Sequence, residues 1–234
     1  MNIVNFLRER SQALAQMHHL DTQEIVENVY AIKTKGANFF IVGSGEGEYI
    51  AIDAGGGNKS VIAAELAKLN IEPEKVRAAF LTHTDFDHVA ALGLFKNATI
   101  YLSEQEVQMI DGTTSRLPHM GKSRLNRTRL DHSYTTIEDG EELCFGDLGV
   151  KCILTPGHTE GSMSFLINGT YLFVGDSLSL SNGRVDLFNS TFNISDDVQR
   201  QSLRNLAKIQ GIQYVFTAHY GFSDHYVEAF KDFV

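Results

Sequence analysis

The chain has 234 residues, a formal net charge of −9 and 43% hydrophobic residues, which is the composition of an ordinary globular protein with a core of its own. The negative charge argues against a protein that binds nucleic acid or an anionic membrane surface. The chain has no apolar run long enough to span a bilayer, and its two cysteines are too few for a disulfide framework.

The first twenty residues predict a short amphipathic helix. Their apolar side chains cluster at Ile3, Val4, Phe6 and Leu7, and the basic start and cleavage site of a signal peptide are lacking. We expect this helix, within residues 1–20, to pack on the body of the protein or on a partner subunit, which leaves a homodimer open. The expected compartment is the cytoplasm.

The next segments predict strands followed by a helix. Residues 28–57 contain short β-type runs broken by glycines, which is typical of an antiparallel meander. Residues 58–71 have apolar side chains at helical spacing. Residues 76–83 predict a strand, and residues 88–95 predict the start of a helix behind it.

The second half of the chain repeats this alternation. Residues 98–110 predict a strand and then a helix, with Ser103 as its cap and Glu106 three positions later. Strands or strand pairs are expected in the segments 149–158, 162–176 and 211–221, and a capped helix in 195–209. The sequence therefore predicts one α/β domain over residues 1–234, with sheets sandwiched between helices.

Histidines and aspartates occur where predicted strands give way to loops, a usual place for functional side chains. The stretch LTHTDFDHVAAL, residues 81–92, holds four of them, and three more follow later strands. They are His83, Asp85, Asp87, His88, His158, Asp176 and His219. Residues two apart on an extended backbone point to one side, so His83 and Asp85 share one centre, whereas Asp87 and His88 follow a turn and can face another. Four imidazoles and three carboxylates are enough for two metal ions with positions left for water.

These motifs, in this order and together with IAIDAGGG at residues 50–57, resemble the metallo-β-lactamase-fold hydrolases over nearly the whole chain. The resemblance implies an α/β fold of the αββα four-layer sandwich type, with the site along one edge of two sheets. It implies a first metal held by His83, Asp85 and His158. It also implies a second metal held by Asp87, His88 and His219, a bridging Asp176, and Asp53 as a support behind the ligands.

Asp85 departs from the common family motif, which has histidine at this position. Three carboxylates and a bridging hydroxide nearly balance the charge of two divalent ions, whereas a histidine would leave one more positive charge. A carboxylate is also a harder ligand than imidazole, so iron or manganese should compete with zinc. We expect an Asp85→His substitution to keep the fold and to shift the preference towards zinc.

The resemblance implies a metal-dependent hydrolase with two divalent metal ions per chain, either zinc or iron or manganese. A metal-bound hydroxide would cleave an ester, thioester, lactone or phosphodiester type bond, and Asp87 is the expected catalytic residue that orients it and accepts a proton. The alternative is a di-iron oxidoreductase with a separate electron donor, because flavodiiron oxygen and nitric-oxide reductases also have a carboxylate at the position of Asp85. A non-catalytic binding protein is a further alternative, against which the intact ligand set argues.

Residues 112–134 concentrate positive charge in an acidic chain, through Arg116, Lys122, Arg124, Arg127 and Arg129. This charge indicates either a solvated surface or an anion-binding rim over the site. In the second interpretation Arg124, Arg127 and Arg129 contact a small-molecule substrate of anionic character, since guanidinium groups suit carboxylate and phosphate. Tyr220, next to His219, is a further candidate for substrate contact.

Overall fold

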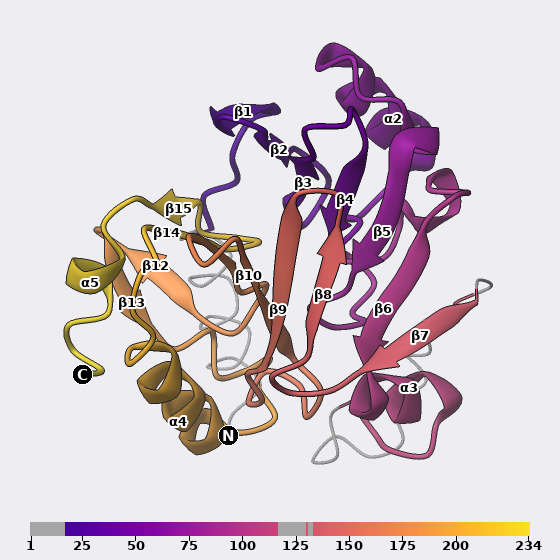
Figure 1. Ribbon diagram of the computed structural model, residues 1–234. Coiled ribbons are helices and arrows are strands. Elements are labelled where there is room, and N and C mark those ends of the chain that lie inside the picture. The colour runs from indigo at the N-terminus through magenta and orange to yellow at the C-terminus, as the bar shows by residue number, and fades with distance from the viewer. Residues whose placement is uncertain (1–16, 117–129, 131–132) are drawn as a thin grey trace.

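The computed structural model of the protein describes residues 17–116, 130 and 133–234 (Figure 1). A seven-stranded sheet, in the order β1-β2-β3-β4-β5-β6-β7, contains the first half of the described chain. Its strands are β1 (Gln23–Val26), β2 (Val29–Ile32), β3 (Phe39–Gly43), β4 (Tyr49–Ile52), β5 (Val76–Phe80), β6 (Thr99–Ser103) and β7 (Tyr134–Ile137). The pairs from β1 to β4 are antiparallel, as the meander predicts, and those from β4 to β7 are parallel.

A second sheet has six strands in the order β15-β14-β11-β10-β9-β8. They are β8 (Glu142–Phe145), β9 (Leu148–Leu154), β10 (Met163–Ile167), β11 (Tyr171–Phe173), β14 (Tyr214–Phe216) and β15 (Phe222–Ser223). β10 is antiparallel to both β9 and β11, and β14 is parallel to β11, so β9, β11 and β14 run in one direction. A small hairpin joins β12 (Ser179–Ser181) and β13 (Arg184–Asp186).

Helices cover the outer faces of both sheets. Figure 1 shows α2 (Lys59–Lys68) and α3 (Glu104–Asp111) on one side and α4 (Asp196–Leu206) and α5 (Tyr226–Ala229) on the other. Ile62 of α2 packs in one apolar cluster with the first sheet, and Leu203 of α4 packs in another with the second. A third cluster, which includes Phe80 and Phe165, lies between the sheets. Three apolar interfaces between four layers confirm the expected αββα sandwich.

Two predicted helices are capped as the sequence indicates. The Ser195 side chain accepts a hydrogen bond from the Val198 N–H at the start of α4, and Ser103 accepts one from Glu106 at the start of α3. These bonds satisfy amide groups that the first turn of a helix leaves without an internal partner.

The helix predicted for residues 88–95 is wrong, because this segment holds only a short 3₁₀ turn, η2 (Leu92–Leu94). The first residues of this segment form backbone hydrogen bonds with the turn after β4. The Ala54 N–H donates to the His88 carbonyl at 2.6 Å, and the Ala90 N–H donates to the Gly55 carbonyl at 2.8 Å. The turn after β4 therefore anchors the end of the motif loop.

The helix predicted for residues 1–20 falls largely on residues 1–16, which lie outside the described residues. Residues 17–20 are not helical. The His18 N–H donates to the carbonyl of His219 at 2.7 Å, so this segment reaches the edge of the expected site. Within the described ranges, no helix combines the length and the apolar character needed to cross a membrane.

Candidate metal centre

The expected metal ligands all follow strands that end at one edge of the two sheets. Parallel strands deliver their carboxyl ends to the same edge, and this holds for β4 and β5 in the first sheet and for β9, β11 and β14 in the second. The ligand segments follow these strands directly. They are Asp53 after β4, the His83–His88 loop after β5, His158 after β9, Asp176 after β11 and His219 after β14.

Asp176 lies between two pairs of imidazoles. Its Oδ2 atom is 3.5 Å from Nε2 of His158 and 4.0 Å from Nε2 of His83. Its Oδ1 atom is 3.6 Å from Nε2 of His88 and 3.3 Å from Nε2 of His219. A tetrahedral ion with ligands at roughly 2.1 Å holds those ligands about 3.4 Å apart. Each oxygen of Asp176 therefore has two imidazoles at a separation that suits a shared ion.

The remaining two carboxylates complete the two halves. Oδ2 of Asp85 is 3.7 Å from Nε2 of His83 and 3.3 Å from Nε2 of His158. Oδ2 of Asp87 is 3.8 Å from Nε2 of His219. We call the group of His83, Asp85 and His158 the first half-site and the group of Asp87, His88 and His219 the second half-site. Within each group one ligand atom per residue lies within 4.8 Å of the others.

Three buried ligand atoms have no hydrogen-bond partner among the described residues. They are Nε2 of His83, Nε2 of His88 and Oδ1 of Asp176. These three residues also form a group whose ligand atoms lie within 4.8 Å of one another. A buried polar atom without a partner costs about 1–3 kcal/mol, so three that converge call for a common partner. The donor set fits a divalent cation.

Asp53 and Thr82 fix the orientation of two ligand imidazoles. Oδ2 of Asp53 lies 2.9 Å from Nδ1 of His88, and Asp53 also accepts hydrogen bonds from the amide and hydroxyl of Thr82 at 2.7 and 2.8 Å. Because the Thr82 hydroxyl donates to Asp53, it accepts from Nδ1 of His83, 3.1 Å away. With Nδ1 of each ring bonded in this way, each Nε2 faces the centre, which is the atom that a metal ligand has to offer.

The buried charges of the centre also call for a cation. Burial opposes ionisation of Asp176, but the neighbouring charges of His219 and His88 outweigh it and hold its pKa below the usual range. Burial lowers the pKa of His88, yet Asp176 and Asp53 overcome this effect and raise it to about 10. In the absence of metal, His88 therefore retains a proton that a metal ion would displace.

Arg116 forms a buried ion pair with Asp85, which the sequence analysis did not foresee. Nε and Nη2 of Arg116 lie 2.8 Å from the two carboxylate oxygens of Asp85. Nη2 is also 2.9 Å from Nε2 of His158 and donates to the carbonyl of Phe192 at 3.0 Å. Arg116 is only 6% exposed, so its expected place in an anion-binding rim is wrong. The sequence did contain a signal for this ion pair: Asp85 stands where the common motif has a neutral histidine. A buried carboxylate needs a cation as its partner.

The Asp85–Arg116 pair changes the charge argument made from the sequence. The guanidinium cancels the carboxylate, so the first half-site carries the same formal charge as one with a neutral histidine at position 85. The part of the preference for iron or manganese that rests on charge therefore fails. The part that rests on the hardness of a carboxylate ligand is unaffected.

Glu106 is a second buried residue whose position the sequence does not reveal. Its Oε2 accepts hydrogen bonds from the amide and hydroxyl of Thr84 at 2.7 and 2.6 Å, and its Oε1 accepts one from the hydroxyl of Thr159 at 2.5 Å. Burial raises its pKa to about 7. Glu106 therefore ties the motif loop after β5 to the loop that carries His158.

A cavity of about 230 Å³ opens onto the ligands. Four of its lining residues are apolar: Met17, Phe86, Phe188 and Phe192. The side chain of Phe86 is 73% exposed, as at the rim of an opening.

Of the substrate contacts predicted from the sequence, only Tyr220 is among the described residues. Tyr220 is buried and packs edge-on against Phe188, with ring centroids 5.9 Å apart, and it is not among the lining residues. Arg124, Arg127 and Arg129 lie outside the described residues. Their contact with substrate therefore stays a prediction.

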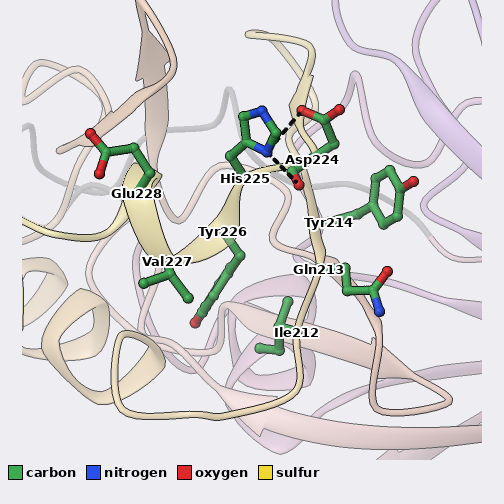
Figure 2. A pocket seen from close by; sticks show the side chains of 8 residues that line it. All are labelled: Ile212, Gln213, Tyr214, Asp224, His225, Tyr226, Val227 and Glu228. Carbon is green, nitrogen blue, oxygen red and sulfur yellow. Dashed lines mark hydrogen bonds and ion pairs between the residues drawn. The ribbon is translucent and has the colours of Figure 1, made fainter.

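A second hollow lies between β14 and α5 (Figure 2). Figure 2 shows Asp224 and His225 paired with each other there, and Nδ1 of His225 is 3.1 Å from the Asp224 carbonyl. None of the metal-type groups found among the described residues includes a residue of this hollow. The candidate metal groups therefore all lie in the centre around Asp176.

Named proteins with similar sequences include hydrolases. A probable metallo-hydrolase of Methanocaldococcus jannaschii is 28% identical over 163 residues, which cover 70% of this chain and 66% of that protein. A hydroxyacylglutathione hydrolase of Aeromonas hydrophila is 31% identical over 137 residues, 57% of this chain and 51% of its own. The chain thus spans about half to two thirds of the length of these relatives.

Solved structures with the same fold support this relationship. A metallo-β-lactamase family protein of Thermus thermophilus is 20% identical and superposes with a TM-score of 0.67, covering 89% of this chain and 79% of its own. BJP-1, a subclass B3 metallo-β-lactamase of Bradyrhizobium japonicum, is 17% identical with a TM-score of 0.67, covering 87% and 79%. The family model of the metallo-β-lactamase superfamily matches residues 33–219, a span that runs from β3 to the last ligand. The chain therefore belongs to the metallo-β-lactamase superfamily.

Proposed function

We propose that the protein is a metal-dependent hydrolase with a two-metal centre that cleaves acyl substrates, with esters, thioesters and lactones as the substrate class. The observation that carries the proposal is the convergence of buried, partnerless ligand atoms on both sides of Asp176. A site of this kind is formed only by folding, and it lies at the base of a cavity rather than on a flat surface.

Different side chains of the centre have different roles in the proposed hydrolysis. Divalent ions bound there lower the pKa of water and polarise the bond under attack. Asp87 lines the cavity and its Oδ2 lies 3.8 Å from Nε2 of His219, so it is placed to orient an attacking water and to accept its proton. Asp53 and Glu106 hold the ligand loops in position from behind.

The cavity wall favours an acyl group of apolar character. Phe86, Phe188 and Phe192 offer aromatic surface beside the ligands, and burial of apolar surface stabilises a complex by about 25 cal/mol per Å². The relative named hydroxyacylglutathione hydrolase supports a thioester among the candidates. A negatively charged leaving part would suit the predicted rim of Arg124, Arg127 and Arg129.

The test compares metal-free and zinc-reconstituted protein on ester, thioester, lactone and phosphodiester model substrates. We expect acyl substrates to be cleaved only after reconstitution, with longer acyl chains preferred over acetyl. Preference for the phosphodiester would contradict the acyl class, and activity that survives metal removal would contradict the metal dependence. A parallel sample loaded with iron, in which oxygen consumption is followed with an electron donor, tests the oxidoreductase alternative.

A further inference from the structure

The lone pair of His158 Nε2 points to a protein cation. Nδ1 of His158 lies 3.4 Å from Oδ1 of Asn193, to which it donates, so the acceptor lone pair is on Nε2. That nitrogen is 2.9 Å from Nη2 of Arg116. An unprotonated imidazole nitrogen has one lone pair, so it cannot accept from Arg116 and bind a metal ion at the same time.

Arg116 is held firmly in this position. Its two contacts with Asp85 form a bidentate pair, and it donates to the backbone carbonyls of His158 and Phe192 at 3.0 Å each. The planar guanidinium loses little freedom on forming such contacts. Nη2 shares its two hydrogens among Asp85, His158 and Phe192. An ion that enters the first half-site has to displace Nη2 from His158.

The two half-sites differ in this respect. Nε2 of His88 and Oδ1 of Asp176, which face the second half-site, have no partner among the residues that the structure describes. In the first half-site, only Nε2 of His83 lacks a hydrogen-bond partner among the described residues. Arg116 contacts Nε2 of His158 and both carboxylate oxygens of Asp85. Among the described residues, an arginine therefore contacts the donors of the first half-site, and none contacts those of the second.

We propose that Arg116 competes internally for the donors of the first half-site, so that the chain binds one divalent ion tightly and a second one weakly. The proposal rests on the metal-dependent function proposed above and specifies how the two ions are taken up. The tight ion uses the second half-site and Asp176. The weak ion enters the first half-site only when Nη2 of Arg116 leaves His158.

The opposite role for Arg116 would be to hold Asp85 in place for the metal. Residues that hydrogen-bond to a metal ligand typically raise the metal affinity by about 10- to 100-fold, and their loss weakens binding. The two roles predict effects of opposite sign when Arg116 is removed. The affinity of the first half-site therefore decides between them.

The experiment titrates metal-free protein with zinc against a chelating indicator, and with cobalt(II) followed by visible absorption. We expect the parent to bind one ion at least about tenfold more tightly than the second. In Arg116→Met the weaker site should gain at least about tenfold in affinity, while the tight site changes little. Arg184→Met is the matched control, because Arg184 pairs with Glu228 and Asp232 on the surface, away from the centre.

A double variant guards against loss of fold. Asp85→His combined with Arg116→Met removes both members of the buried pair and leaves no uncompensated charge, so both of its sites should bind tightly. Two equal sites in the parent, or a weaker first site in Arg116→Met, would overturn the role of Arg116. No metal binding in any variant, including the control, would instead contradict the proposed function itself.

Discussion

Nδ1 of His88 lies 2.9 Å from Oδ2 of Asp53, and Asp53 in turn accepts two hydrogen bonds from Thr82. This contact links the turn after β4 to the loop after β5, since Asp53 follows Ile52 directly. It also fixes which nitrogen of His88 faces the centre. We therefore expect Asp53 to act on metal binding through His88, without being a ligand itself.

Asp53→Ala should weaken metal binding by about 10- to 100-fold, because His88 loses the acceptor that sets its tautomer. The second half-site should lose most, since it contains His88. Competition with a chelator of known affinity measures the change. Asp224→Ala, at an exposed aspartate of the second hollow, is the control and should bind metal as the parent does. Equal affinities in the two variants would show that Asp53 has no such role.

Asp176→Asn should lower metal content and reduce hydrolysis by orders of magnitude. Each oxygen of Asp176 faces two imidazoles, at 3.3 to 4.0 Å, and the amide replaces one oxygen by a donor that cannot bind a cation. Elemental analysis after reconstitution and the rate on the preferred acyl substrate are the two measurements. Full metal content together with full activity would remove Asp176 from the centre.

Asp85→His should keep the fold but destabilise the metal-free protein. The substitution leaves the buried guanidinium of Arg116 without its carboxylate, and loss of one partner of a buried pair costs about 3 kcal/mol. Denaturant unfolding measures this cost. The double variant with Arg116→Met should recover most of the lost stability. A single variant as stable as the parent would show that the pair contributes nothing to the fold.

The sequence indicated the candidate ligands because each one follows a strand, and strand periodicity is a local signal. His83, His158 and His219 could be placed at strand ends without knowledge of the partner strands. The two sheets then bring them together, because β5 in one sheet and β9 and β14 in the other end at the same edge. The alternation of strands and helices predicted sheets between helices, and the family resemblance implied the four layers.

Arg116 and the segment 88–95 were placed wrongly because their partners are distant in the sequence. Arg116 meets Asp85 across 31 positions, from a stretch whose composition indicates a solvated loop. The segment 88–95 has helical periodicity, but its amides find acceptors at Ala54 and Gly55. A local sequence pattern cannot predict such contacts, because they form between residues that are distant in the sequence.

Glu106→Gln should change how stability depends on pH. The pKa of Glu106 rises from 4.5 to about 7 on folding, so between these values the folded protein holds a proton that the unfolded chain has released. Stability from this group is therefore lost as pH rises from 4.5 through 7, by about 3 kcal/mol. The glutamine variant should gain in stability relative to the parent over this range.

The free energy of unfolding of the parent and of Glu106→Gln, measured between pH 5 and pH 8 in steps of about one pH unit, gives this difference in stability. Glu104→Gln serves as the control for the substitution itself, because Glu104 is exposed on the same helix. A stability difference between Glu106→Gln and the parent that does not change with pH would mean that Glu106 is ionised throughout.

Phe86→Ser should raise KM for substrates with long apolar acyl groups and leave kcat nearly unchanged. Phe86 lines the cavity and is 73% exposed in the free protein, so its ring contributes binding surface without supporting the core. Loss of that surface affects the ground state and the transition state alike, which appears in KM rather than in kcat. An increase in KM of about tenfold corresponds to about 1.4 kcal/mol, a fraction of the free energy gained by burying a phenylalanine side chain.

Val227→Ser, at a 77% exposed position of the second hollow, is the control. If Phe86→Ser has the same KM values as the parent for long and short acyl chains, the apolar wall does not select the substrate. Specificity would then be expected from the charged rim predicted at Arg124, Arg127 and Arg129.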